Sequence, residues 1–233
     1  MAVRRAAIAL AAAVASFGLD SGAAAAEPQC PLAQPARVDV SLDDPEPSLE
    51  PGAAMEGFGA EDATRRGAAY RHLGVTTSRV EWQSEVEAAI EKSSGRVCAR
   101  PERVSITLRH PEHSVRIARE LPRGGCLFRE TEAHEQRHVL VNRATLRRAA
   151  AELEAAARSW AASAVGRGAT EQSAMAALQA GLRTAIAPAL EAMQAARDAQ
   201  HREIDRPEEY QRLGRVCPEE HRAIRERTAA QAR

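Results

Sequence analysis

The chain has 233 residues, carries 32 basic and 32 acidic side chains, and is only 3% aromatic. This balance of charge supplies no field that would attract nucleic acid or anionic lipid, and so few aromatic residues leave little surface on which bases could stack. We therefore expect no nucleic-acid partner, and a chain of this length can form one domain with a sizeable core.

Residues 1–26 have the pattern of a secretory signal peptide. Arg4 and Arg5 precede an apolar, uncharged run at 6–19, and the segment ends in small residues, with alanine at 24–26. The run is shorter than the roughly 20 apolar residues that span a bilayer, and no later segment is long and apolar enough. We expect an exported protein, periplasmic or secreted, without stable membrane insertion. An uncleaved anchor is the alternative.

The next segment, residues 27–66, is rich in Pro, Gly, Asp and Glu. We interpret it as an acidic leader that is partly disordered, because such a composition offers few apolar side chains to bury. Within it, residues 38–42 alternate apolar and polar side chains, which predicts one strand.

A domain is predicted over residues 67–217, and it opens with a sheet. Residues 104–108 and 114–118 each alternate apolar and polar side chains, as half-buried strands do. We predict that these two strands belong to a small antiparallel sheet that begins near residues 70–80. The pattern of residues 85–92 is compatible with either a short helix or a strand.

Two long helices are predicted after the sheet. Residues 128–160 contain neither Pro nor Gly and are rich in good helix formers. Gly166 and Gly168 then interrupt the helix, and Thr170 is a suitable cap for a second helix with an apolar stripe. Helices joined by a short loop usually pack antiparallel, so the sequence predicts an α+β fold with a long helical hairpin. A polar tail is expected at 218–233.

The most informative motif lies in the first helix, where His134, Glu135 and His138 spell H-E-x-x-H. Residues four apart share one face of a helix, so both imidazoles can reach the same metal ion. Glu135 then lies beside the ion, where a carboxylate can take the proton from a zinc-bound water. The motif is typical of zinc metalloproteases and predicts zinc as the cofactor. Chance occurrence on a surface helix is the alternative.

The antiparallel hairpin also predicts where a third zinc ligand lies. If both helices rise evenly from the loop, the two motif histidines face residues near 196–200, and His201 and Asp205 follow directly. Both point towards the apolar stripe, whereas Glu203 points away from it. His201 is our first choice as third ligand, and Asp205 is either the alternative ligand or the residue that orients a zinc-bound histidine. A kink at Pro188 would change this register.

Four cysteines, at positions 30, 98, 126 and 217, predict two disulfides in an oxidising compartment. Cys98 precedes the predicted strand pair and Cys126 follows it, so a bridge between them would clamp the sheet. We favour this pairing, with Cys30 joined to Cys217, over the two other possible pairings. No C-x-x-C spacing indicates zinc binding by thiolates.

Together these segments resemble a bacterial family of predicted secreted zinc-dependent proteases. The resemblance covers roughly residues 70–217, and its marks are the run 115–122, then Cys126, then H-E-x-x-H, and finally residues 204–210 with Cys217. It implies a zincin-like fold, zinc ligation by the two motif histidines, Glu135 as catalytic base and a metal-site role for Asp205.

The expected function is therefore that of an exported zinc metallopeptidase acting on a polypeptide, which would add as an extended strand along a free sheet edge. Oxyanion donors are sought among Tyr70, His110, His113 and Tyr210. The alternative is a non-enzymatic helical interaction module in which the metal is structural or absent, and in that case Glu135 has no purpose. Substrate preference and oligomeric state do not follow from the sequence.

Overall fold

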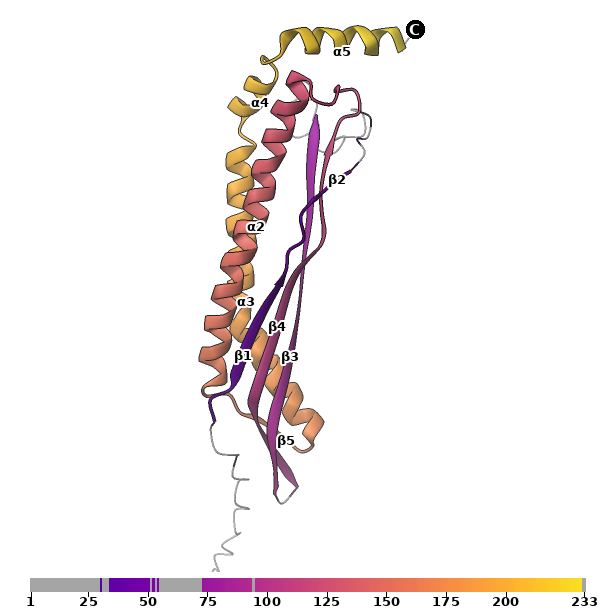
Figure 1. The fold of residues 1–233 in the computed structure, drawn as a ribbon. Coiled ribbons are helices and arrows are strands. Elements are labelled where there is room, and N and C mark those ends of the chain that lie inside the picture. The colour runs from indigo at the N-terminus through magenta and orange to yellow at the C-terminus, as the bar shows by residue number, and fades with distance from the viewer. Residues whose placement is uncertain are drawn as a thin grey trace, which may run out of the picture.

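A computed structural model of the chain describes residues 34–50, 73–93 and 95–231, together with Cys30, Gly52 and Ala54. The predicted signal peptide and Tyr70 lie outside the described residues. The described part is elongated, and two long helices run along one face of a sheet of long strands (Figure 1).

The sheet is built around a long antiparallel hairpin of β3 (Gly74–Ser93) and β4 (Arg96–Ile117). β1 (Arg37–Asp43) and β2 (Ser48–Glu50) both pair with β4 in parallel, and β5 (Gly166–Gly168) pairs with it antiparallel. The predicted all-antiparallel sheet is thus wrong, because the leader contributes two strands that run in the same direction as β4.

The two strands predicted at 104–108 and 114–118 are one continuous strand, β4. The polar residues between them suggest a turn, but the chain stays extended. Arg109 pairs with Glu81 and Glu112 with Arg79, so β4 carries an extra residue there and forms a bulge around Pro111. A bulge tolerates proline because ladder hydrogen bonds are interrupted at it. The true partner of β4 is β3, which includes the undecided segment 85–92.

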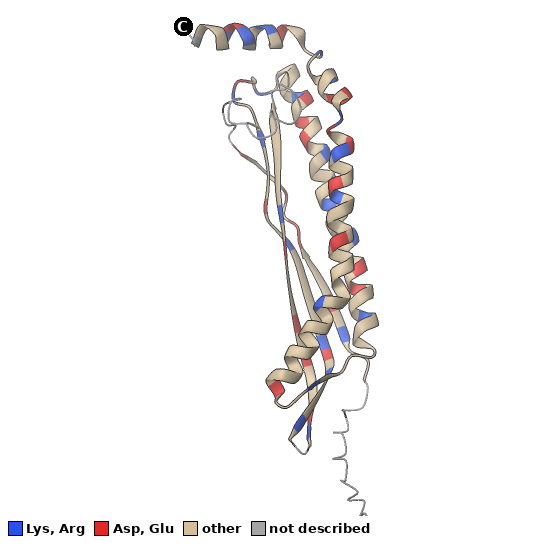
Figure 2. Ribbon diagram, turned by 180° about the vertical axis from the view of Figure 1, so that it is seen from behind, with Lys and Arg blue, Asp and Glu red and all other residues tan. Residues whose placement is uncertain are grey.

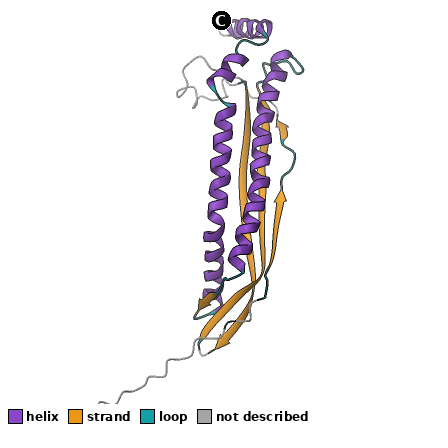
Figure 3. Cartoon of the chain, turned by 90° about the vertical axis from the view of Figure 1, so that its left-hand side faces the viewer, coloured by secondary structure: helices purple, strands orange, loops and turns teal. Residues whose placement is uncertain are grey.

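The helical hairpin is confirmed: α2 spans Cys126–Ala161 and α3 spans Glu171–Ile204. Thr170 caps α3 in a capping box with Ser173, and α3 continues through Pro188. Both helices lie over the same face of the sheet (Figure 3). The main core between helices and sheet buries large side chains fully, among them Ile106, Leu108, Leu146, Leu153, Leu178, Leu182 and Ile186. A leucine buried in this way contributes roughly 2–5 kcal/mol relative to alanine.

Gly166 allows α3 to approach the sheet closely. A Cβ atom at this position would lie 2.2 Å from the carbonyl oxygen of Ala174 and 2.7 Å from Cγ of Leu178. Gly166 and Gly168, which the sequence predicted to break the first helix, lie beyond its end at Ala161 and form β5, the strand on which the start of α3 rests.

The disulfides join Cys30 to Cys98 and Cys126 to Cys217, so the favoured pairing was wrong. Cys98 lies near the end of β4 that follows the turn from β3, whereas Cys126 comes after the opposite end of β4. About 20 residues of extended chain, roughly 60 Å, separate them, which no disulfide can bridge. The two observed bridges instead clamp opposite ends of the molecule.

No helix in the described part of the chain is long and apolar enough to cross a bilayer.

After α3 the chain forms α4 (Pro207–Leu213) and α5 (Pro218–Gln231). Helix α5 crosses the end of the helical hairpin at which α2 begins (Figure 1). The segment predicted as a polar tail thus contains a helix with a buried residue, Ile224. Its Glu220 accepts hydrogen bonds from the backbone N–H groups of Cys126 (2.7 Å) and Leu127 (2.8 Å). The first turn of α2 has no cap from its own N-terminal residue, so Glu220 supplies one from α5.

Replacing Glu220 by glutamine should therefore destabilise the protein by about 0.5 kcal/mol near pH 7, the low end for a helix cap because the site is solvated. The two backbone donors hold the pKa of Glu220 below its ordinary value. Since the folded-state pKa is lowered, this stabilisation is present above the unfolded pKa of about 4.3 and is lost as the pH falls through the folded pKa. Urea unfolding at several pH values checks this.

The neighbouring Glu219→Gln variant is the matched control. Glu219 is exposed, and in the described part of the chain its carboxylate forms an ion pair only with Arg222. An equal loss in both variants, or a loss for Glu220→Gln that persists at acidic pH, would contradict the cap.

Candidate metal centre

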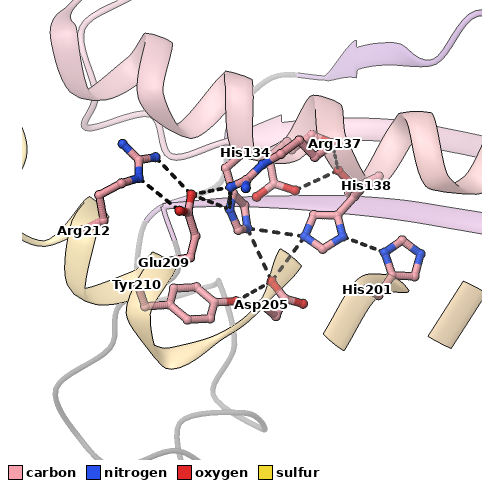
Figure 4. Close-up of polar contacts among 10 residues, drawn as sticks. His134, Arg137, His138, His201, Asp205, Glu209, Tyr210 and Arg212 are labelled. Carbon is pink, nitrogen blue, oxygen red and sulfur yellow. Dashed lines mark hydrogen bonds and ion pairs between the residues drawn. The ribbon is translucent and has the colours of Figure 1, made fainter. Parts of the chain in front are cut away.

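The motif residues His134, Glu135 and His138 lie on the inner face of α2, and all three are buried (4%, 4% and 8% exposed). They occupy the half of the hairpin where α2 begins and α3 ends. Buried polar side chains need partners, and here partners come from α3 with its C-cap and from α4 (Figure 4), and from Thr76 of β3.

Asp205, at the C-terminal end of α3, faces both motif histidines. Its Oδ1 lies 3.4 Å from Nε2 of His134 and 3.2 Å from Nε2 of His138, and the two Nε2 atoms are 3.3 Å apart. A tetrahedral zinc ion with bonds of about 2.0–2.1 Å has ligand atoms roughly 3.3 Å from one another. The three atoms already form one face of such a tetrahedron.

Asp205 depends on the hydrogen-bond donors around it to stay ionised. It is the C-cap residue of α3, where the carbonyl end of the helix carries partial negative charge. Burial alone would raise the pKa of Asp205, but hydrogen bonds from His134, His138 and Tyr210 outweigh it and hold that pKa well below its usual range. The hydroxyl of Tyr210 donates to Oδ1 over 2.8 Å. The carboxylate is therefore ionised and directed at the two imidazoles.

His201 contacts the other side of the His138 ring. The two Nδ1 atoms are 2.6 Å apart, and Nε2 of His201 lies 2.9 Å from Oδ1 of Asn142. Burial, with the charge of His138, lowers the pKa of His201 to about 4, so its ring is neutral at physiological pH. If Nε2–H donates to Asn142, Nδ1 of His201 accepts from Nδ1–H of His138. With a metal ion bound, that chain would leave the lone pair of His138 Nε2 for the ion.

Glu209 of α4 lies at the other nitrogen of His134. Its Oε1 is 3.4 Å from Nδ1, and Nη2 of Arg137 lies 2.9 Å from the same Nδ1. The carboxylate of Glu209 also pairs with Arg137 and Arg212. The hydrogen bond from Arg212 is the main reason why the pKa of Glu209 falls to about 2. The carboxylate of Glu209 and the guanidinium of Arg137 together fix the orientation of the His134 ring.

Glu135 is held at the centre by β3. The hydroxyl of Thr76 donates to its Oε2 over 2.7 Å, and a Cβ atom at Gly74 would lie only 2.9 Å from Oε1. Burial raises the pKa of Glu135, although the Thr76 hydrogen bond and the two motif histidines oppose that shift. The glutamate is thus close enough to interact electrostatically with His134, His138 and Asp205, and it is tied to the sheet.

The donor set suits zinc. Two imidazole nitrogens and one carboxylate oxygen are common zinc ligands, and a site with three protein ligands retains a position for water. The buried carboxylate of Glu135 and the half-buried carboxylate of Asp205 would be balanced by a divalent cation. The two buried histidines and the half-buried aspartate could hold a metal ion.

Of the two residues predicted as third ligand, Asp205 belongs to the triad and His201 lies behind His138. Glu203 is exposed, as expected. The structure also adds three residues that the sequence analysis did not identify. Asn142 follows His138 by four residues, so its place on the same helix face could have been recognised, whereas nothing local marks Thr76 or Glu209.

Comparisons with protein-family models, curated proteins and solved structures give no match to this chain. The resemblance to secreted zinc-dependent proteases therefore stays a prediction, and the site must be judged by its own geometry.

The contacts predict different effects for the two candidate third ligands. Asp205→Asn should abolish zinc binding at this centre, whereas His201→Ala should keep the ion and weaken its affinity by about 10- to 100-fold, as loss of a residue that orients a ligand does. Competition with a chromophoric chelator measures both. His221→Ala is the control, since His221 contacts the carbonyl oxygen of Leu213 instead. Loss of zinc from His201→Ala with retention in Asp205→Asn would reverse the assignment.

Proposed function

We propose that this protein is a zinc-dependent metallopeptidase whose metal is held by His134, His138 and Asp205. The observation that carries the proposal is Glu135, a carboxylate buried beside three ligand atoms without being one of them. Burying a carboxylate is costly, and a purely structural site has no use for it. A hydrolytic site needs a base in that position.

Each residue has a distinct task in this proposal. Zinc, when bound, supplies an acidified water and polarises the carbonyl of the scissile bond. His134 and His138 present their Nε2 atoms. Arg137 and Glu209 occupy the opposite side of the His134 ring, and His201 occupies that of the His138 ring. Asp205 contributes the negative ligand, and Tyr210 holds it in place.

Glu135 is the proton carrier. Thr76 fixes Oε2, so Oε1 is the oxygen available to accept a proton during attack and to return it to the leaving amine. The missing side chain at Gly74 leaves the space next to Oε1 clear. A raised pKa brings a carboxyl group closer to the pH at which it must both accept and release a proton.

The edge of β3 offers a place for an extended substrate. In the described part of the chain β3 pairs only with β4, so its other edge is unpaired. Thr76, which holds Glu135, lies in this strand. A peptide that adds along this edge by main-chain hydrogen bonds would pass the proposed base, which favours a polypeptide substrate. Acidic and basic residues are interspersed over the visible elements (Figure 2), which indicates no selection for a highly charged substrate.

Replacing Glu135 by glutamine should lower kcat for peptide hydrolysis by about 10²- to 10⁴-fold, the usual contribution of a general base, while zinc stays bound. The amide preserves the shape of the side chain but cannot take the proton. Activity is measured on an unfolded protein substrate, with zinc content determined on the same samples.

Glu152→Gln is the matched control, an exposed glutamate of the same helix, and it should keep full activity. Equal activity of Glu135→Gln and the unaltered chain would contradict the catalytic role. If the unaltered chain binds no zinc after reconstitution, the non-enzymatic helical module is the better account.

A further inference from the structure

A second group of buried histidines lies on β4, outside the centre described above. In a regular strand, residues three apart point to opposite faces. The bulge around Pro111 removes this alternation, and both His110 and His113 are buried (2% and 7% exposed), with ring centroids 4.7 Å apart. The bulge therefore serves to bring two imidazoles together.

Asp44, between β1 and β2, completes the group. Its Oδ1 lies 2.9 Å from Nδ1 of His110, while Oδ2 is held by Arg143 (3.0 Å) and Arg147 (3.6 Å) of α2. One carboxylate oxygen is thus anchored to the helix, and the other is directed at the histidines. Glu46 also pairs with Arg143, so the two acidic residues offset the two arginines.

The imidazoles of this group are short of partners. Nε2 of His110 and both ring nitrogens of His113 are buried without a hydrogen-bond partner among the described residues. Buried imidazoles normally satisfy both nitrogens, and each one left unpaired costs free energy. A neutral imidazole keeps one lone pair, so each of these two rings has a nitrogen to offer to a metal ion.

We propose that Asp44, His110 and His113 form a second zinc site, separate from the catalytic centre. One potential ligand atom from each residue lies within 4.8 Å of the others. The set of two imidazoles and a carboxylate suits zinc or a similar transition-metal ion. The ion would supply a contact to one nitrogen of each imidazole.

The location gives this second site a structural role. Its three side chains are almost fully enclosed, whereas the side chain of Asp205 at the first centre is 22% exposed. The ion would join the connection between β1 and β2 to β4, while Arg143 and Arg147 link the same aspartate to α2. It would therefore fasten the leader segment to the domain.

Zinc content distinguishes the two sites. The purified protein, reconstituted with Zn²⁺ alone and freed of excess, should hold two ions per chain by elemental analysis. His113→Gln and Asp44→Asn should each hold one, and His134→Ala should hold the other one. His113→Gln combined with His134→Ala should hold none. His221→Gln, which alters a histidine outside both groups, should keep two.

Circular dichroism and the zinc retained at the first centre show whether His113→Gln is folded, and His110→Gln serves as a second variant. Two ions in both His113→Gln and His110→Gln would overturn the proposal. The proposal would also be overturned if the unaltered chain held a single ion that is lost only in His134→Ala. The imidazoles of His110 and His113 would then be hydrated polar groups. Neither result depends on peptidase activity.

Discussion

The register between α2 and α3 is the constraint on which the first centre depends. The antiparallel hairpin sets His138 against both His201 and Asp205, and a shift of one turn along either helix would separate the ligand atoms by about 5 Å. The leucines of the main core fix that register, because close-packed side chains do not slide continuously past one another. The geometry of this centre is therefore a consequence of hydrophobic packing farther along the same helices.

Charge determines what this packed hairpin can hold. Asp205 lies at the negative end of α3 and Glu135 is buried beside it, an arrangement that is unfavourable unless positive charge is present. Arg137 and Arg212 pair instead with Glu209, behind His134. The positive charge at the centre must therefore come from protonated histidines or from a metal ion. Only a metal ion would engage the lone pairs of both Nε2 atoms. This is the physical reason for favouring an ion-binding site over a polar network.

The helices could be predicted from sequence because their signals are local. The run without Pro or Gly and the cap at Thr170 give α2 and α3 nearly to the residue. The sheet was predicted less well, since Pro111 and its polar neighbours look like a turn although they form a bulge in one long strand. That error also produced the wrong disulfide pairing, because a hairpin would have placed Cys98 near Cys126. The parallel pairing of β1 leaves no local mark at all.

The candidate site, too, was predictable only where the sequence carries a local signal. H-E-x-x-H could be found as a motif, and residues 201–205 could be found by counting from the loop of the helical hairpin. The choice between His201 and Asp205 depends on the relative height of the two helices, which an assumption of even rise does not provide. In Figure 1 the start of α3 extends beyond the end of α2, so residues equally distant from the loop do not face each other. Thr76 comes from a strand distant in sequence, and only the folded chain brings it to Glu135.

The most direct test of the central claim is a crystal structure of the zinc-loaded protein with the ion located by its anomalous scattering. The account predicts a zinc ion at bonding distance from Nε2 of His134, Nε2 of His138 and a carboxylate oxygen of Asp205, with no fourth protein ligand and with Glu135 beside the open position. An ion bound by His201 in place of Asp205, or a fourth side chain that closes the site, would contradict it.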